Sequence, residues 1–298
     1  MRVNPNYTAN MVDLLNQSQL AETNALRAVS TGRRVNKPSD DPAASAAMVA
    51  ENSRSSASDQ YTASSESLMQ VLNATDSTLG SVVTMLQRAT TLGVEAANSA
   101  TMNQTDLNSI AQEISGIKDQ MLSLANTSYA GQYVFAGTAT GTAPYVANAA
   151  DPSKIDYVGN GQQNQVQIGT GLTVSANLPG NSVFSQSSGD VFGALQSMLT
   201  ALKSGDNAGI TAALTSISAA SNAVNTSRVF YGNTVNELTS NESYLSQEKV
   251  NIASYQNTLV SADPAEAITA MAQAQYARTA TVAAAAKMSQ VSLLDYLK

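Results

Sequence analysis

The chain has 298 residues, a formal net charge of −7 and a pI of about 4.6, which argues against a general nucleic-acid binder. It contains no cysteine and no histidine, so thiol chemistry and disulfides are excluded, and the commonest general base and transition-metal ligand are missing. Aromatic residues make up only 5% of a chain that is 43% hydrophobic, so we expect its apolar surface to be buried through many small contacts along long helices.

Residues 1–38 are predicted to form a terminal helix with a narrow apolar stripe. Apolar and small residues recur at a spacing of three and four through positions 11, 14, 18, 21, 25, 28, 32 and 35. A stripe of such small side chains buries too little surface to hold a lone helix in water. We therefore expect this segment to become ordered only against partners, with Met11, Leu14 and Leu15 among the contacts.

The sequence Ser39-Asp40-Asp41-Pro42 predicts the start of a long helix, because a capping carboxylate stands before a proline at the first helical position. Asp263-Pro264 repeats this arrangement, and Glu266 would complete a capping box there. Successive residues do not share a helix face, so we interpret the two adjacent carboxylates as caps rather than a metal or acid–base site.

A basic cluster precedes this helix start. Arg33, Arg34 and Lys37 lie within five residues of an otherwise acidic chain. We interpret them as partners of a helix end, through ion pairs or bonds to carbonyl groups, rather than as a phosphate site.

Long helices are predicted on both sides of the middle of the chain, because no proline occurs between Pro42 and Pro144 or between Pro179 and Pro264. Apolar residues follow the seam spacing of a coiled coil in three stretches. The predicted seams run through positions 61, 65, 68, 72, 75, 79, 82, 86 and 89; through 107, 110, 114, 117, 121 and 124; and through 210, 214, 217, 221, 224, 228, 231, 235, 238, 245, 252 and 259. Arg228 is the weakest residue of the third seam.

Residues 131–184 are predicted to form a small β region. They hold eight of the 17 glycines and three of the seven prolines. Short β-branched or aromatic runs at 133–135, 154–158, 165–168 and 172–174 alternate with turns such as Gly159-Asn160-Gly161. These glycines do not join a strand to a helix as in a dinucleotide fingerprint, so we interpret them as turns.

The last segment, residues 262–298, mirrors the first. Its stripe runs through Ile268, Met271, Gln275, Val282, Ala285, Ser289, Leu293 and Tyr296. Leu293, Leu294, Tyr296 and Leu297 form its densest apolar group, and with Ile268, Met271 and Val282 they complete the predicted assembly interface.

The predicted fold is mainly α: a long, coiled-coil-like helical bundle formed by both halves of the chain, with a small β insertion and terminal helices that order on assembly. We divide the chain into residues 1–38, 39–130, 131–184, 185–261 and 262–298. No run of 18 apolar residues predicts a transmembrane helix, and the first residues lack the apolar core of a cleaved signal. No catalytic residue, metal site or cofactor is predicted.

Two motifs resemble those of the flagellin family, which comprises flagellins and hook–filament junction proteins. Residues 30–44, which include Arg33, Asn36, Asp40 and Asp41, resemble the family's N-terminal signature, and residues 292–297 resemble its shared ending. The sequence with proline on both sides of Ser-Asp-Asp resembles that of the junction proteins, since flagellins usually carry alanine where Pro38 and Pro42 stand. The runs 131–137 and 177–184 resemble the entry and exit of the junction type's β region.

This resemblance implies a structural adaptor of the bacterial flagellum. Such a subunit would form a ring with its own copies and join hook-associated protein 1 to flagellin. It would leave the cell through the flagellar type III export apparatus with a chaperone and without a cleaved signal, and it would not insert into a membrane. Three alternatives remain open: a flagellin, an enzyme carried on the β insertion, and a secreted adhesin or signalling ligand.

Overall fold

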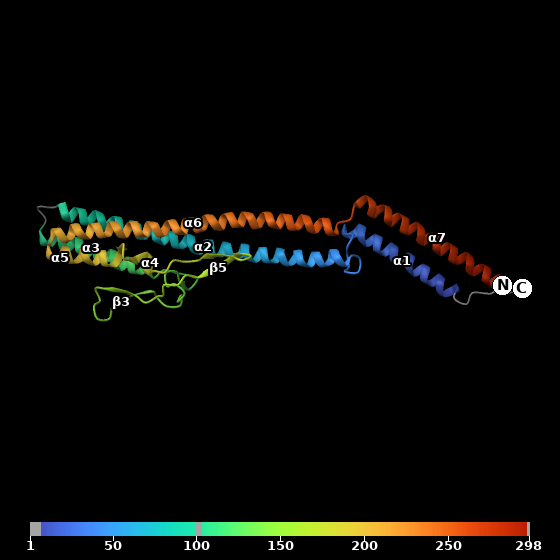
Figure 1. Cartoon of the computed structure of the whole chain (residues 1–298), viewed down its shortest axis with the longest axis horizontal. Coiled ribbons are helices and arrows are strands. Elements are labelled where there is room, and N and C mark those ends of the chain that lie inside the picture. The colour runs from blue at the N-terminus through green and yellow to red at the C-terminus, as the bar shows by residue number, and fades with distance from the viewer. Residues whose placement is uncertain (1–6, 99–102, 297–298) are drawn as a thin grey trace. The chain divides into compact units, whose positions relative to one another are not determined.

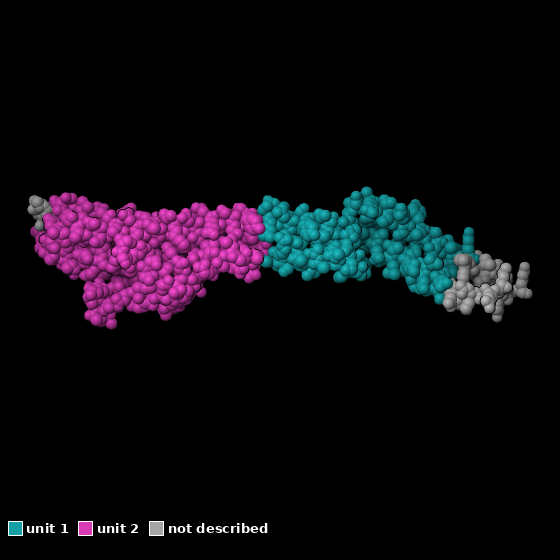
Figure 2. Space-filling view, in the orientation of Figure 1, with its two compact units in different colours: residues 1–57, 247–298 teal, residues 58–246 magenta. Residues whose placement is uncertain are grey.

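The computed structural model describes residues 7–98 and 103–296, and the side chains of residues 9–98 and 103–287. The chain forms two compact units, residues 58–246 and residues 1–57 with 247–298 (Figure 2). The helices are α1 (Tyr7–Thr31), α2 (Pro42–Asn98), α3 (Gln104–Ala125), the short α4 (Asn181–Phe184), α5 (Val191–Ser204), α6 (Asn207–Val260) and α7 (Pro264–Tyr296) (Figure 1). The prediction of a mainly α fold with a small β region is confirmed.

The predicted seams of α2 and α3 are buried. Every predicted position from 65 to 89 in α2 and from 110 to 121 in α3 is buried, and Tyr61, Leu107 and Leu124 at the ends of these seams are half-buried. Leucine, isoleucine and valine at a spacing of three and four present one continuous apolar face, which a neighbouring helix can cover.

Only part of the predicted seam of α6 is buried. Its seven-residue repeat at 210, 217, 224, 231, 238, 245 and 252 is buried, but the intervening core positions are 213, 220, 227 and 234, one residue before those predicted. These four residues are Ala, Ala, Ser and Thr, whose small side chains allow close approach. Arg228 lies on the flank instead, where Nε and Nη2 donate to the two carboxylate oxygens of Asp76 at 2.9 and 3.1 Å.

Two breaks divide the predicted long-helix segments. Asn103 begins α3 with a capping box, accepting from the Asp106 backbone N–H while Asp106 accepts from its own. Gly205 ends α5 in the left-handed region at φ 65°, so α5 and α6 are separate helices. The predicted segments 39–130 and 185–261 therefore each contain two helices.

The β region consists of four two-stranded antiparallel sheets. The pairs are β1 (Ser128–Tyr129) with β2 (Gln132–Tyr133), β3 (Tyr145–Ala147) with β4 (Ile155–Tyr157), β5 (Gln165–Gly169) with β6 (Leu172–Ser175), and β7 (Ser185–Gln186) with β8 (Gly189–Asp190). Each predicted run meets a strand, but Val134 and Phe135 lie beyond β2. They enter the core instead, and Phe135 is fully buried.

An aromatic cluster joins the β region to the helices. The ring centroids of Phe135 and Phe184 lie 5.1 Å apart, those of Tyr145 and Phe184 5.6 Å, and those of Tyr145 and Phe192 of α5 5.2 Å. Burial raises the pKa of the Tyr145 hydroxyl far above its usual range. The β region therefore shares one apolar core with α2, α3, α5 and α6.

Replacing Gly189 by alanine should destabilise this unit. A Cβ atom at Gly189 would lie 2.7 Å from the carbonyl oxygen of Ala219 in α6, so β8 or α6 would have to shift. We expect a loss of about 1–3 kcal/mol, measured by thermal unfolding. Gly116→Ala is the control: Gly116 is exposed on α3 with open space around it, so that variant should gain up to about 1 kcal/mol. A lower melting temperature for Gly116→Ala alone would contradict the argument.

Candidate assembly surface

The two terminal helices pack against each other within one chain. α1 and α7 run side by side in the unit of residues 1–57 and 247–298 (Figure 1). Their contact stripe consists of positions 11, 15, 18, 22, 25 and 29 in α1 and 267, 271, 274, 281 and 285 in α7, all buried or half-buried. Glu22 and Arg278 form an ion pair across it, with 2.6 Å between Oε2 and Nη1.

The contact stripe shares positions 11, 18, 25, 271 and 285 with the predicted stripes, and between them it lies one residue away from the predicted positions. Positions 14 and 21 in α1 and 268, 275 and 282 in α7, which were predicted to contact partners on assembly, are exposed within the single chain. The stripe combines small residues such as Ala25 and Ala274 with Met11, Leu15, Val29 and Met271 and with the ion pair. It leaves Leu14, Ile268 and Val282 outside.

Large apolar side chains remain exposed all around this helix pair. Leu20 is 61% exposed and Tyr276 is 78% exposed. At about 100° per residue, each lies roughly 180° from the contact stripe of its own helix. Val12 and Leu26 are also more than half exposed. Helices with apolar side chains on several sides are usually covered by other elements on several sides. The pair therefore presents a surface suited to packing against further helices.

The residues predicted as the assembly interface fall into three groups. Met11, Leu15 and Met271 contribute to the α1–α7 contact, whereas Leu14, Ile268 and Val282 face outward. Leu293, Leu294 and Tyr296 lie in α7 with side chains outside the described set, and Leu297 lies outside the described residues. Sequence reasoning missed Val12, Leu20, Leu26 and Tyr276, because they stand off the three-and-four stripe; the signal was their size among so many small residues.

The predicted helix-start residues come together in a connector, which we define as residues 32–41 with residues 261–263. The Arg34 backbone N–H donates to the Val260 carbonyl at 2.7 Å, and its guanidinium donates to the Leu259 carbonyl at 3.1 Å. Arg33 forms a β-bridge with Ser261. The connector thus joins the chain between α1 and α2 to the chain between α6 and α7.

Carboxylates hold the connector in shape. Asp40 Oδ2 accepts from the backbone N–H groups of Asn36 and Lys37 at 3.0 and 2.9 Å. Asp41 Oδ1 accepts from the Ala44 N–H at 3.0 Å, which caps α2, and Asp41 Oδ2 pairs with Arg34 at 3.2 Å.

The other cap and the remaining motif residue also have partners. Asp263 accepts from the Ala265 and Glu266 N–H groups at 2.8 and 3.4 Å and so supplies its half of the predicted capping box. The Asn36 side chain donates to the Arg33 carbonyl at 2.7 Å. Asp41 and Asp263 therefore cap α2 and α7, whereas Asn36 bonds within the connector.

The connector should loosen in acid. Backbone N–H donors lower the pKa of Asp40, and the Ala44 N–H together with Arg34 lowers that of Asp41. Carboxylates with a depressed folded pKa contribute stability that is complete above the unfolded pKa of about 3.9 and is lost as the pH falls through the folded pKa. We expect hydrogen exchange of the amides at 36, 37 and 44 to accelerate below about pH 4, after correction for the intrinsic rate. Asp41→Asn should remove this pH dependence at residue 44 but keep it at 36 and 37; an unchanged profile would contradict the assignment.

Within the described part of the chain, no three Asp or Glu residues are grouped so that they could hold a metal ion. The helices described are too short or too polar to cross a membrane.

Sequence comparisons relate this chain to proteins of the bacterial flagellum. Residues 3–140 match the bacterial flagellin N-terminal helical region. The chain is 30% identical over 294 residues to flagellar hook-associated protein 3 of Escherichia coli K12, covering 91% of each. It is 28% identical over 184 residues to flagellin of Bacillus subtilis 168, covering 60% of this chain and 56% of the flagellin.

Solved structures share the fold. A flagellar hook-associated protein from Vibrio parahaemolyticus superposes with a TM-score of 0.68 at 21% identity, covering 74% of this chain and 100% of that one. Flagellar hook associated protein-3 from Legionella pneumophila gives 0.64 at 15% identity, covering 70% and 98%.

The paired terminal helices, long seam helices and β insertion define a structural subunit of the flagellin type. More particularly, the chain belongs to the flagellar hook-associated protein 3 family, and it is a component of the bacterial flagellum.

Proposed function

We propose that this chain is the adaptor between the flagellar hook and the filament. A ring of its copies would bind hook-associated protein 1 on one side and flagellin on the other. The observation that carries the proposal is the α1–α7 pair, which exposes Leu20 and Tyr276 away from its own contact stripe. An isolated subunit gains nothing from such a surface, whereas neighbouring helix pairs in a tubular assembly would bury it.

The mechanism is packing rather than chemistry. Each terminal helix pair would dock against the pairs of neighbouring subunits, and Leu14, Ile268 and Val282 extend the exposed apolar surface available for this contact. Leu293, Leu294, Tyr296 and Leu297 belong to the same proposed interface. The chain would be exported by the flagellar type III apparatus with a chaperone, without a cleaved signal. An enzymatic role has no support in a flagellar structural family.

A flagellin is the second candidate, supported by the 28% identity to the Bacillus subtilis protein. The junction reading is favoured because the hook-associated relative matches 91% of the chain rather than 60%. The two candidates differ in how far they polymerise. Heterologous contacts that do not close into a ring let flagellin subunits add to a filament indefinitely, whereas an adaptor must stop adding its own copies.

Seeded assembly separates these candidates. Purified chain would be added to hooks that end in hook-associated protein 1, and the ends would be viewed by electron microscopy before and after flagellin is added. We expect a short added layer with no further growth, and filaments only after flagellin follows. Long filaments of the chain alone would indicate a flagellin, and bare hook ends would contradict both roles.

A further inference from the structure

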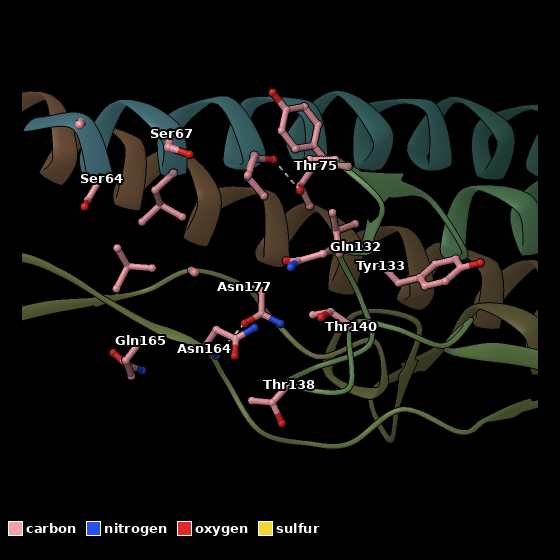
Figure 3. Close-up of a pocket in the computed structure, with 18 of the residues that line it drawn as sticks. Ser64, Ser67, Thr75, Gln132, Tyr133, Thr138, Thr140, Asn164, Gln165 and Asn177 are labelled. Carbon is pink, nitrogen blue, oxygen red and sulfur yellow. Dashed lines mark hydrogen bonds between the residues drawn. The ribbon is translucent and has the colours of Figure 1, made fainter. Parts of the chain in front are cut away.

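A groove of about 880 Å³ lies in the unit of residues 58–246, between α2 and the hairpins β1–β2 and β5–β6 (Figure 3). Ser64 and Ser67 line the wall formed by α2, while Gln132, Thr140, Asn164 and Asn177 gather in the middle of the view. Its volume is typical of sites for small organic ligands. The groove is lined by residues of this unit and by none of the terminal helices, so its use is independent of the proposed junction role.

The lining carries no charge. The described residues that line the groove are Ser, Thr, Asn, Gln, Tyr and aliphatic residues, without any Asp, Glu, Lys or Arg. A phosphate, nucleotide or acidic sugar would be desolvated there without a counter-charge, which is costly. The lining therefore favours a neutral ligand.

Several side chains in the groove have unused hydrogen-bonding capacity. In the described structure, five of the lining side chains make no hydrogen bond to protein. They are those of Gln60, Ser64, Ser67, Gln132 and Thr140. Amides and hydroxyls each offer both donors and acceptors, so together they suit a ligand that is rich in both.

Several backbone groups of the groove, by contrast, are already occupied. The Tyr133 N–H donates to the Thr140 carbonyl at 2.9 Å, and the Ala176 N–H donates to the Asn164 carbonyl at 2.7 Å. The Asn164 N–H donates to Oδ1 of Asn177 at 2.8 Å, and buried Asn177 also donates to the Gly137 carbonyl at 3.1 Å. A peptide that binds by strand addition needs free backbone groups, so these bonds disfavour that mode.

We propose that this groove binds a neutral oligosaccharide. Its hydroxyl groups would bond to the free amides and hydroxyls of Gln132, Ser64 and Ser67. The apolar C–H faces of the sugar rings would lie against Leu68, Val71 and the half-buried Tyr129. The β insertion and α2 would thereby give this flagellar subunit a carbohydrate-binding site.

Saturation-transfer NMR on the full chain tests the proposal with four neutral probes: maltotriose, cellotriose, tri-N-acetylchitotriose and lactose. We expect saturation transfer from the protein to at least one of them at millimolar concentration, and 3′-sialyllactose, which adds a carboxylate to lactose, should give no stronger signal than lactose. The absence of a signal from all four neutral sugars would overturn the proposal.

Two variants in the groove and one control variant outside it test where the sugar binds. Ser67→Leu would add a bulky apolar side chain to the α2 wall of the groove and should reduce the affinity for the responding sugar at least about tenfold, and Gln132→Ala should weaken it several-fold. Ser77→Leu is the matched control, since Ser77 is also an exposed serine of α2 but lies outside the groove. Circular dichroism confirms that each variant is folded. Equal affinity in Ser67→Leu and Ser77→Leu would place the sugar elsewhere and overturn the assignment.

Discussion

Replacing Leu20 and Tyr276 together by serine is expected to abolish attachment of filaments while leaving the melting temperature of the purified subunit nearly unchanged. Both side chains are more than 60% exposed and face away from the α1–α7 contact. Their loss therefore removes little buried surface from the isolated chain.

In the assembled junction the cost should be large. Burying one large apolar side chain contributes about 1.5–3 kcal/mol, so two of them contribute roughly 3–6 kcal/mol to the docking of each subunit. This range corresponds to a factor of more than about a hundred in affinity. Cells that carry the double variant should export the protein and release flagellin into the medium. The measurements are the number of filaments per cell and the melting temperature of the subunit.

A variant inside the helix pair provides the control. Val29 and Met271 are half-buried in the α1–α7 contact stripe, so Val29→Ser with Met271→Ser should loosen the pair itself. We expect faster hydrogen exchange along α1 and α7 in that control and not in the Leu20–Tyr276 variant. Normal filaments in the Leu20–Tyr276 variant would show that these side chains are not assembly contacts. A large fall in its melting temperature would show that they pack within the subunit.

Phe184→Ala should be the most destabilising single substitution in the aromatic cluster. Phe184 is fully buried, and its ring packs against those of Phe135, Tyr145 and Phe192. Truncating a buried phenylalanine costs about 3–5 kcal/mol, because the transfer energy is lost and a cavity remains. For a unit of this size the melting temperature should fall by roughly 6–20 °C, as measured by circular dichroism.

Val158→Ala is the matched truncation, because Val158 is exposed next to β4; its effect should stay within about 0.5 kcal/mol. An equal, small effect of both variants would mean that the cluster does not anchor the β region.

The cluster also affects what a deletion of the β region would do. Removing residues 131–184 takes away Phe135, Tyr145 and Phe184, so such a deletion would expose the helical core rather than trim an independent appendage.

Local rules were sufficient for the existence of the long helices, for the caps and for the seams of α2 and α3. Proline-free stretches and leucines or isoleucines at a spacing of three and four depend only on the chain itself, and these positions are buried in α2, α3 and half of the α6 repeat. Asp41 and Asp263 cap helices for the same local reason, since each stands directly before the first helical residue. The β region was predicted from its turns and β-branched runs.

Tertiary structure decided which face each helix buries. In α6 the small residues Ala213, Ala220, Ser227 and Thr234 are buried in the core, whereas Leu214 and Val235, each one residue further on, pack against it only partly buried. In the terminal helices the contact stripe lies one residue from the predicted one at alternate positions, and the Glu22–Arg278 ion pair joins two distant parts of the chain across it. No local pattern contains that pairing, and for that reason Leu20 and Tyr276 emerged as the exposed surface only once α1 and α7 were seen together.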